Sequence, residues 1–184
     1  WNIVNMLNVK YVIFTQKLPL DNLEYAYYDR TLKQTVYLNK TYLPRAWFVN
    51  NTELIEDKKT IWKKLNDPEF SPAKTAIVEK EVPPTYAPLE SSVTPAGFGL
   101  HELKFNVTTD TTSFLTVSEI YYPAGWKAFI DGKETEIFTT NYILRGVVVP
   151  KGEHTIEMKF ESKTYLWSLK LSLIGLIMAI LIFL

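Results

Sequence analysis

The sequence predicts a mainly β protein of the α+β class: a small α/β N-terminal part, an antiparallel, jelly-roll-like β-sandwich and a C-terminal transmembrane helix. Two observations carry this prediction. Short β-branched and aromatic runs, separated by turn formers, fill residues 98–161, a pattern typical of antiparallel sandwiches. The uncharged segment LSLIGLIMAILIFL then occupies residues 171–184, and long apolar runs of this kind cross bilayers as helices.

Residues 1–81 are predicted to form the α/β subdomain. Ile3, Met6 and Leu7 have helical spacing, and a convincing amphipathic helix is predicted over residues 53–65, where lysines oppose the apolar side and Pro68 follows the end. Strand-like runs surround these two helices, at residues 9–14, 24–28, 35–38, 47–49 and 74–80.

Residues 82–97 contain four prolines and little periodicity, which predicts an inter-subdomain linker or a long surface loop. The sandwich is predicted over residues 98–161. Asp131-Gly132 between two strand-like runs predicts a type I′ hairpin turn, because that turn needs positive φ at both positions. The sandwich strands are expected at residues 100–107, 113–121, 126–130, 134–138, 143–149 and 155–160.

The transmembrane helix is predicted over residues 165–184, which would span about 30 Å. Tyr165 and Trp167 are placed for an interfacial aromatic belt, and Lys170 is close enough to the boundary to snorkel. A buried core helix and a surface-lying helix are the alternatives, and both fit less well because the run lacks a polar face. We expect the chain to be a piece of a longer membrane protein, because no flank follows the span and the first residue is Trp1.

The composition restricts the possible functions. Twenty basic and twenty acidic residues balance without a long block of either sign, which argues against a nucleic-acid partner. The sequence has no cysteine and two histidines, so disulfides, thiolate zinc sites and histidine-rich metal sites are excluded. We expect no metal site and no cofactor, and interpret His101 and His154 as ordinary surface imidazoles.

Five residues are candidates for substrate binding. Tyr122 and Trp126, with neighbouring Tyr121 and Phe129, could form a sugar-stacking platform, although Trp126 alternates with Ala128 and Ile130 as a core residue would. Arginine binds phosphate or carboxylate in a fork, but a structural ion pair or backbone clamp is the favoured role of the two candidate arginines. The asparagine is expected to cap a turn. The candidates are Arg45, Tyr122, Trp126, Asn141 and Arg145.

A glycosidase needs two carboxylates about 5–10 Å apart in a cleft. The acidic residues of the sandwich fit that role poorly, because they lie in a turn or at strand positions expected to face water. We therefore predict no catalytic residue among Glu102, Glu119, Asp131, Glu134 and Glu136.

Several phrases of the sequence are too particular for composition to explain. They are LNVKYVI at 7–13, LPRAWFV at 43–49, DPEFSPAKT at 67–75, YYPAGWKAFIDGK at 121–133 and RGVVVP at 145–150. In this order, before an apolar tail, they resemble the C-terminal part of the YfhO family of bacterial multi-pass membrane proteins. Ala124 departs from the family phrase by lengthening it one residue, which is expected to move Trp126 relative to its strand.

The resemblance implies a glycosyltransferase-like membrane protein that uses lipid-linked sugars and modifies cell-envelope polymers such as lipoteichoic acid. It implies that the catalytic carboxylates lie in extracytoplasmic loops outside this chain. The favoured hypothesis is therefore a non-catalytic extracytoplasmic domain at the bacterial cell membrane, with the membrane, the rest of its own chain and envelope glycan or lipid-linked sugar as partners. A stand-alone carbohydrate-binding module and a purely structural cap on membrane loops are the alternatives.

Overall fold

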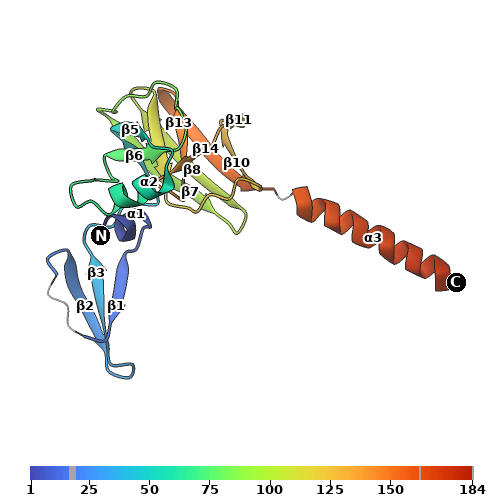
Figure 1. Cartoon of the computed structure of the whole chain (residues 1–184), viewed down its shortest axis with the longest axis horizontal. Coiled ribbons are helices and arrows are strands. Elements are labelled where there is room, and N and C mark those ends of the chain that lie inside the picture. The colour runs from blue at the N-terminus through green and yellow to red at the C-terminus, as the bar shows by residue number, and fades with distance from the viewer. Residues whose placement is uncertain (17–19, 162, 184) are drawn as a thin grey trace.

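The computed structural model describes residues 1–16, 20–161 and 163–183, and it confirms a mainly β protein with antiparallel sheets and a C-terminal helix (Figure 1). The helices are α1 (Asn2–Met6), α2 (Lys58–Leu65) and α3 (Lys163–Phe183). The strands before residue 90 are β1 (Tyr11–Phe14), β2 (Leu23–Asp29), β3 (Gln34–Asn39), β4 (Ala46–Val49), β5 (Asn51–Leu54) and β6 (Thr75–Val78). The later strands are β7 (Ser91–Phe98), β8 (Glu102–Thr109), β9 (Ser113–Val117), β10 (Trp126–Ile130), β11 (Lys133–Thr135), β12 (Phe138–Thr140), β13 (Leu144–Val149) and β14 (Gly152–Phe160).

Two sheets form the sandwich. The five-stranded sheet has the order β11-β10-β14-β8-β7, and the six-stranded sheet has the order β4-β9-β13-β12-β6-β5. Alternation along β8 buries Leu103, Phe105 and Val107 and leaves the residues between them exposed. These side chains meet Leu115, Val117, Val147 and Ile156 from β9, β13 and β14 in the core between the sheets.

The outer face of the six-stranded sheet carries a second core. Met6 of α1 and Ile61 and Leu65 of α2 pack against strand residues that include Val49, Ile77 and Phe114. The sheet is therefore buried on both faces, which explains the continuous burial along β9.

The helix predicted over residues 53–65 is shorter than expected. Asp57 is the N-cap, since its side chain accepts a hydrogen bond from the Thr60 amide at 2.8 Å. Residues before it form β5, which pairs in parallel with β6 and so makes a β5-α2-β6 crossover. Pairing with β6 outweighs the helical spacing of Leu54 and Ile55.

The segment expected to be a linker or loop contains a strand. Residues 91–98 form β7, an edge strand whose register shifts between Pro95 and Gly97. Proline is tolerated there because an edge strand at a bulge does not need every backbone amide to donate a hydrogen bond to a neighbouring strand. Moreover, β4 pairs with β9, so strands from both sides of this segment are neighbours in one sheet.

The strand predicted over residues 134–138 is divided in two. β11 ends the five-stranded sheet, and β12 lies inside the six-stranded one, so the chain changes sheets between Thr135 and Phe138. The predicted type I′ turn is confirmed: Asp131 and Gly132 have φ of 50° and 80°, and Ile130 pairs with Lys133.

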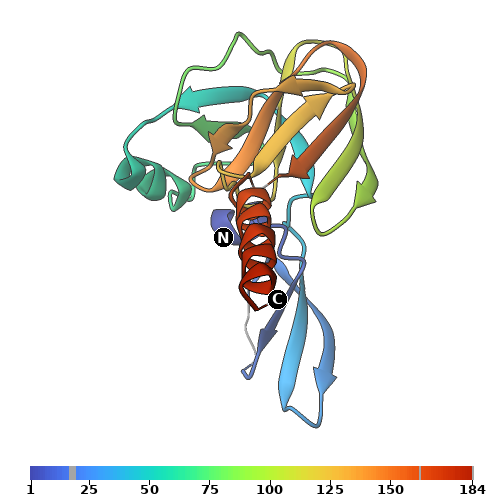
Figure 2. The ribbon, with the colours of Figure 1, turned by 90° about the vertical axis from the view of Figure 1, so that its right-hand side faces the viewer.

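Two elements leave the sandwich (Figures 1 and 2). One is a three-stranded antiparallel sheet of order β1-β3-β2, and the other is α3. Among the residues that the structure describes, no helix reaches the combination of length and hydropathy that a membrane crossing requires.

Candidate functional site

Four of the five candidate residues gather at one end of the sandwich, the end where β14 finishes. Arg145 of β13 is buried, with 2% of its surface exposed. Its Nη2 and Nε donate hydrogen bonds to the carbonyl of Ile120 at 2.8 and 3.2 Å. Its guanidinium carbon lies 3.6 Å from the centroid of the Trp126 ring. Arg145 is thus a backbone clamp stacked on an indole.

Burial lowers the pKa of Arg145 to about 10, although Glu119 and Tyr121 act in the opposite direction. Desolvation is the cause, because a charged group loses hydration inside the protein. The side chain still carries its positive charge at neutral pH. The site therefore contains a buried cation whose Nε and Nη2 donate to backbone and whose Nη1 faces the sulfur of Met158.

Arg45 lies nearby with its side chain 43% exposed. Its Nη1 is 3.6 Å from Glu119 Oε1, and its guanidinium lies 4.7 Å from the centroid of the Phe98 ring. Arg45 is therefore the more exposed of the two candidate arginines.

Trp126 and Tyr122 both contact Phe160, the last residue of β14. Ring centroids are 5.4 Å apart for Trp126 and Phe160, and 6.3 Å apart for Tyr122 and Phe160. Trp126 is half-buried against the sandwich core, whereas Tyr122 is exposed. Ala124 lies in the turn before β10, and Trp126 begins that strand opposite Phe160.

Asn141 lies apart from these residues and is fully buried. Its Oδ1 accepts a hydrogen bond from the backbone amide of Ile77 at 2.8 Å, and its backbone amide donates to the Ile77 carbonyl at 2.8 Å. The expected turn cap therefore bonds backbone 64 residues away, and it joins the β12–β13 turn to β6. Its φ of 48° lies in the left-handed region that asparagine tolerates.

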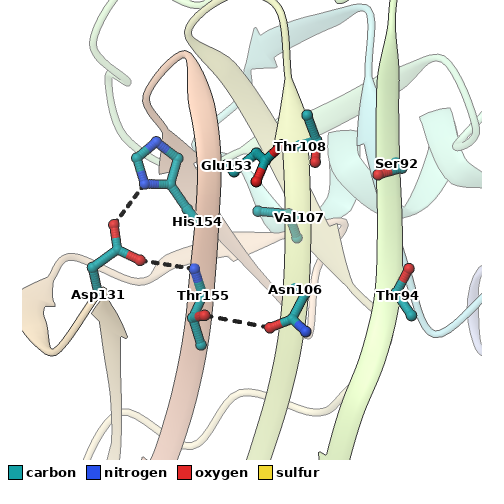
Figure 3. Close-up of a pocket in the computed structure, with 9 residues that line it drawn as sticks. All are labelled: Ser92, Thr94, Asn106, Val107, Thr108, Asp131, Glu153, His154 and Thr155. Atoms are coloured by element: carbon teal, nitrogen blue, oxygen red, sulfur yellow. Dashed lines mark hydrogen bonds and ion pairs between the residues drawn. The ribbon is translucent and has the colours of Figure 1, made fainter.

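A second site was not predicted from the sequence: a polar groove of about 410 Å³ over β7, β8 and β14 (Figure 3). Hydroxyl, amide, carboxylate and imidazole groups line it. The lining residues are Ser92, Thr94, Asn106, Val107, Thr108, Asp131, Glu153, His154 and Thr155.

Asp131 organises one side of this groove. Its Oδ2 lies 2.6 Å from His154 Nδ1, and its Oδ1 accepts from the Thr155 amide at 2.8 Å. The hydrogen bond with His154, then that with Thr155, lower the pKa of Asp131. His154, expected to be an ordinary surface imidazole, is therefore half-buried and held by Asp131. Alternation along β8 could have identified Asn106 and Thr108 as exposed polar residues. The sequence could not have shown that β10 pairs with β14, which brings Asp131 to His154.

The acidic residues considered for a glycosidase pair mostly lie beside basic groups. Glu119 contacts Arg45, Glu134 lies 4.0 Å from Lys127, and Glu136 contacts Lys80. Within the described residues, no cluster of three or more histidine and acidic side chains could hold a metal ion.

The comparison with known families decides the identity. The sequence pattern of the family described as bacterial membrane protein YfhO matches residues 89–181, half of the chain. The chain belongs to the YfhO family. The YfhO match covers β7 to β14 and most of α3, and it includes the phrases at 121–133 and 145–150.

No curated protein and no solved structure matches this chain. Membership of the YfhO family makes this chain part of a bacterial membrane protein.

Proposed function

We propose that this chain is an extracytoplasmic accessory domain that α3 anchors in the bacterial cell membrane. In this proposal it supports transfer of sugar from a lipid carrier to cell-envelope polymers by the rest of its own protein. One observation carries it: the two elements that leave the sandwich, the three-stranded sheet and α3, both expose large apolar and aromatic side chains. Large exposed apolar surfaces mark contacts with proteins or membranes.

The described apolar side chains of α3 support anchoring. Leu171, Leu173, Ile174, Leu176, Ile177, Ile180 and Leu181 are all exposed. Lipid could cover these side chains without leaving backbone polar groups unpaired, because the N–H and C=O groups of a helix form hydrogen bonds with each other. The sequence of residues 171–184 adds no charge to this surface.

The three-stranded sheet supports contact with the rest of the protein. Tyr11, Ile13, Tyr25, Tyr27 and Tyr28 are exposed on it, and tyrosine is enriched at protein interfaces. Asn39 fixes this sheet to α1, because its Nδ2 donates to Asn5 Oδ1 and to the Val9 carbonyl. The sheet is thus presented as a unit, and we assign its uncovered tyrosines to the membrane-embedded part of the same chain.

Anchoring is tested by washing vesicles that carry the purified chain with alkaline carbonate. The wild type should remain with the lipid, and the double variant Leu173→Lys/Ile177→Lys should be released. Equal retention of both, or release of the wild type, overturns the anchor.

Support of glycosyl transfer is tested in the source bacterium, with sugar on envelope polymers measured by NMR. Tyr25→Ser/Tyr27→Ser should lower glycosylation while the protein stays in the membrane. Tyr86→Ser is the control, since Tyr86 is equally exposed but lies outside the sheet. Normal glycosylation in the double variant would overturn support of transfer through this sheet and leave glycan binding and the structural cap.

A second candidate function is glycan binding, favoured by the polar groove. The hydroxyl and amide groups of Ser92, Thr94, Asn106 and Thr108 match the hydrogen-bonding groups of a sugar. A glycan array with the whole chain tests it. Loss of binding in Asn106→Ala would place the glycan in the groove, whereas loss in Tyr122→Ala or Arg45→Ala would place it at the end of the sandwich. An empty array for the wild type excludes this function.

A further inference from the structure

Two loops at the α3 end of the sandwich carry exposed apolar side chains, which we call the apolar rim: Phe98, Leu100, Ile120 and Tyr122. Leu100, at the tip of the β7–β8 hairpin, is 93% exposed. Ile120, in the connection from β9 to β10, is 62% exposed. Burying a large apolar side chain of this kind is favourable by about 1.5–3 kcal/mol of free energy relative to leaving it in water. A covering partner is therefore expected.

The rim is built rigidly. Arg145 holds the carbonyl of Ile120 with two hydrogen bonds, so the Ile120 side chain is presented outward by a buried clamp. The hairpin is closed by a bond from the Gly99 amide to the Glu102 carbonyl at 2.8 Å. The ring of Phe98 is stacked against Arg45 on one side and packs edge-to-face on Phe105 on the other.

Both rim loops are tied to the residues that lead into α3. The Phe160 amide donates to the His101 carbonyl at 2.8 Å, and the Glu161 amide donates to the Gly125 carbonyl at 2.7 Å. The first bond fixes the β7–β8 hairpin, which lies beside the end of β14 (Figure 1). The second fixes the turn that follows Tyr122. Gly125 is required for this arrangement, because a Cβ there would lie 2.2 Å from the Phe160 ring.

The distance from the rim to α3 is therefore short. α3 begins at Lys163, two residues after Glu161, and two extended residues reach about 7 Å at most. A bilayer surface that crosses the first turns of α3 therefore lies close to both rim loops.

We propose that the apolar rim lies in the interfacial layer of the lipid bilayer that α3 enters. This inference rests on the proposed membrane anchoring and adds a second contact that fixes the tilt of the sandwich on the membrane. Tyr122 suits this layer because its ring can be buried while its hydroxyl stays in water, and Phe98, Leu100 and Ile120 add apolar surface that can insert.

Charge around the rim is mixed. Arg45 and Lys127 are paired with Glu119 and Glu161, and Glu102 adds a further negative charge. Attraction to anionic lipid is therefore weak, and apolar insertion is the expected source of binding. The rim should enter neutral and anionic bilayers equally.

The test uses the absence of cysteine in the sequence. A single cysteine is placed at Leu100 or Ile120, labelled with an environment-sensitive fluorophore, and the whole chain is reconstituted into vesicles of phosphatidylcholine alone or with phosphatidylglycerol added. Both labels should shift to the blue and be quenched by brominated lipid, to the same extent in both compositions.

Leu89 is the matched control. It is the same residue type and is also 93% exposed, but it precedes β7, whose eight residues separate it from the rim by about 26 Å. The emission of a label at Leu89 should show no blue shift, and brominated lipid should not quench it.

The outcomes separate this inference from the proposed function. If the labelled chain fails to float with vesicles, the anchor itself is wrong. If it floats but the Leu100 and Ile120 labels report water, anchoring stands and the rim proposal is overturned. A blue shift without quenching by brominated lipid means that protein covers the rim, from another segment or a second copy, and this also overturns it.

Discussion

The guanidinium carbon of Arg145 lies 3.6 Å from the centroid of the Trp126 ring, while its Nη2 and Nε donate to the Ile120 carbonyl. One buried side chain thus connects β13, β10 and the segment between β9 and β10. Lysine has neither the fork nor the plane needed to make these contacts together. The connection gives a direct prediction for stability.

Arg145→Lys should lower the free energy of unfolding by about 2–4 kcal/mol, because it loses a charged hydrogen-bonded fork and a desolvated cation–π contact. Urea denaturation in mild detergent, followed by tryptophan fluorescence, measures it. Arg45→Lys is the control and should change stability by about 0.5 kcal/mol or less, since that ion pair is solvent-exposed. Equal effects of the two substitutions would contradict the clamp.

Asn141 separates a hydrogen-bond effect from a backbone effect. Asn141→Gly keeps the left-handed conformation but leaves the buried Ile77 amide without its acceptor, at an expected cost of about 1–3 kcal/mol. Asn141→Ala should cost about 1 kcal/mol more, because alanine resists positive φ. The same urea experiment measures both, and an Ala variant as stable as the Gly variant would show that φ contributes nothing.

The elements that local pattern controls were predictable. Strand-like runs located β8, β9 and β10, and Asp-Gly identified the turn between β10 and β11. Arrangements set by partners distant in sequence were not. The helical spacing of Leu54 and Ile55 gave way to parallel pairing of β5 with β6, which no local pattern reveals.

The candidate site shows the same limit. The sequence favoured a clamp or ion pair for the two arginines, and the structure gives the clamp to Arg145 and the ion pair to Arg45. Which arginine is buried depends on contacts with Trp126 of β10 and with Ile120 in the connection from β9 to β10. Likewise, Asp131 and His154 meet only because β10 pairs with β14, so each residue alone looked like an ordinary surface group.

Glu157 should make the stability depend on pH in the acidic range. Hydrogen bonds from Lys104 and Lys159 lower its pKa from 4.5 to about 2. Since the folded pKa lies below the unfolded one, the stabilisation is complete above about pH 4.5 and is lost as the pH falls toward 2. Glu157→Gln should therefore flatten this part of the curve of melting temperature against pH.

The control for Glu157 is Glu136→Gln, which removes an exposed ion pair with Lys80. It should leave the acidic slope close to that of the wild type. A slope unchanged in Glu157→Gln would show that other carboxylates dominate the acid response.

Gly146 tests the packing of the second core. A Cβ there would lie 2.2 Å from Cζ of Phe114 and 2.5 Å from Oγ1 of Thr140, so Gly146→Ala must displace a buried ring. We expect a loss of about 3 kcal/mol or more in the free energy of unfolding. Adding Phe114→Leu should relieve part of the overlap, so the double variant should lose less than the two single losses together. Additive losses in the double variant would show that the Phe114 ring is not what excludes a side chain at Gly146.

The control for Gly146→Ala is Gly132→Asn, since a Cβ at the Gly132 turn meets no atom within 4 Å and asparagine tolerates its φ of 80°.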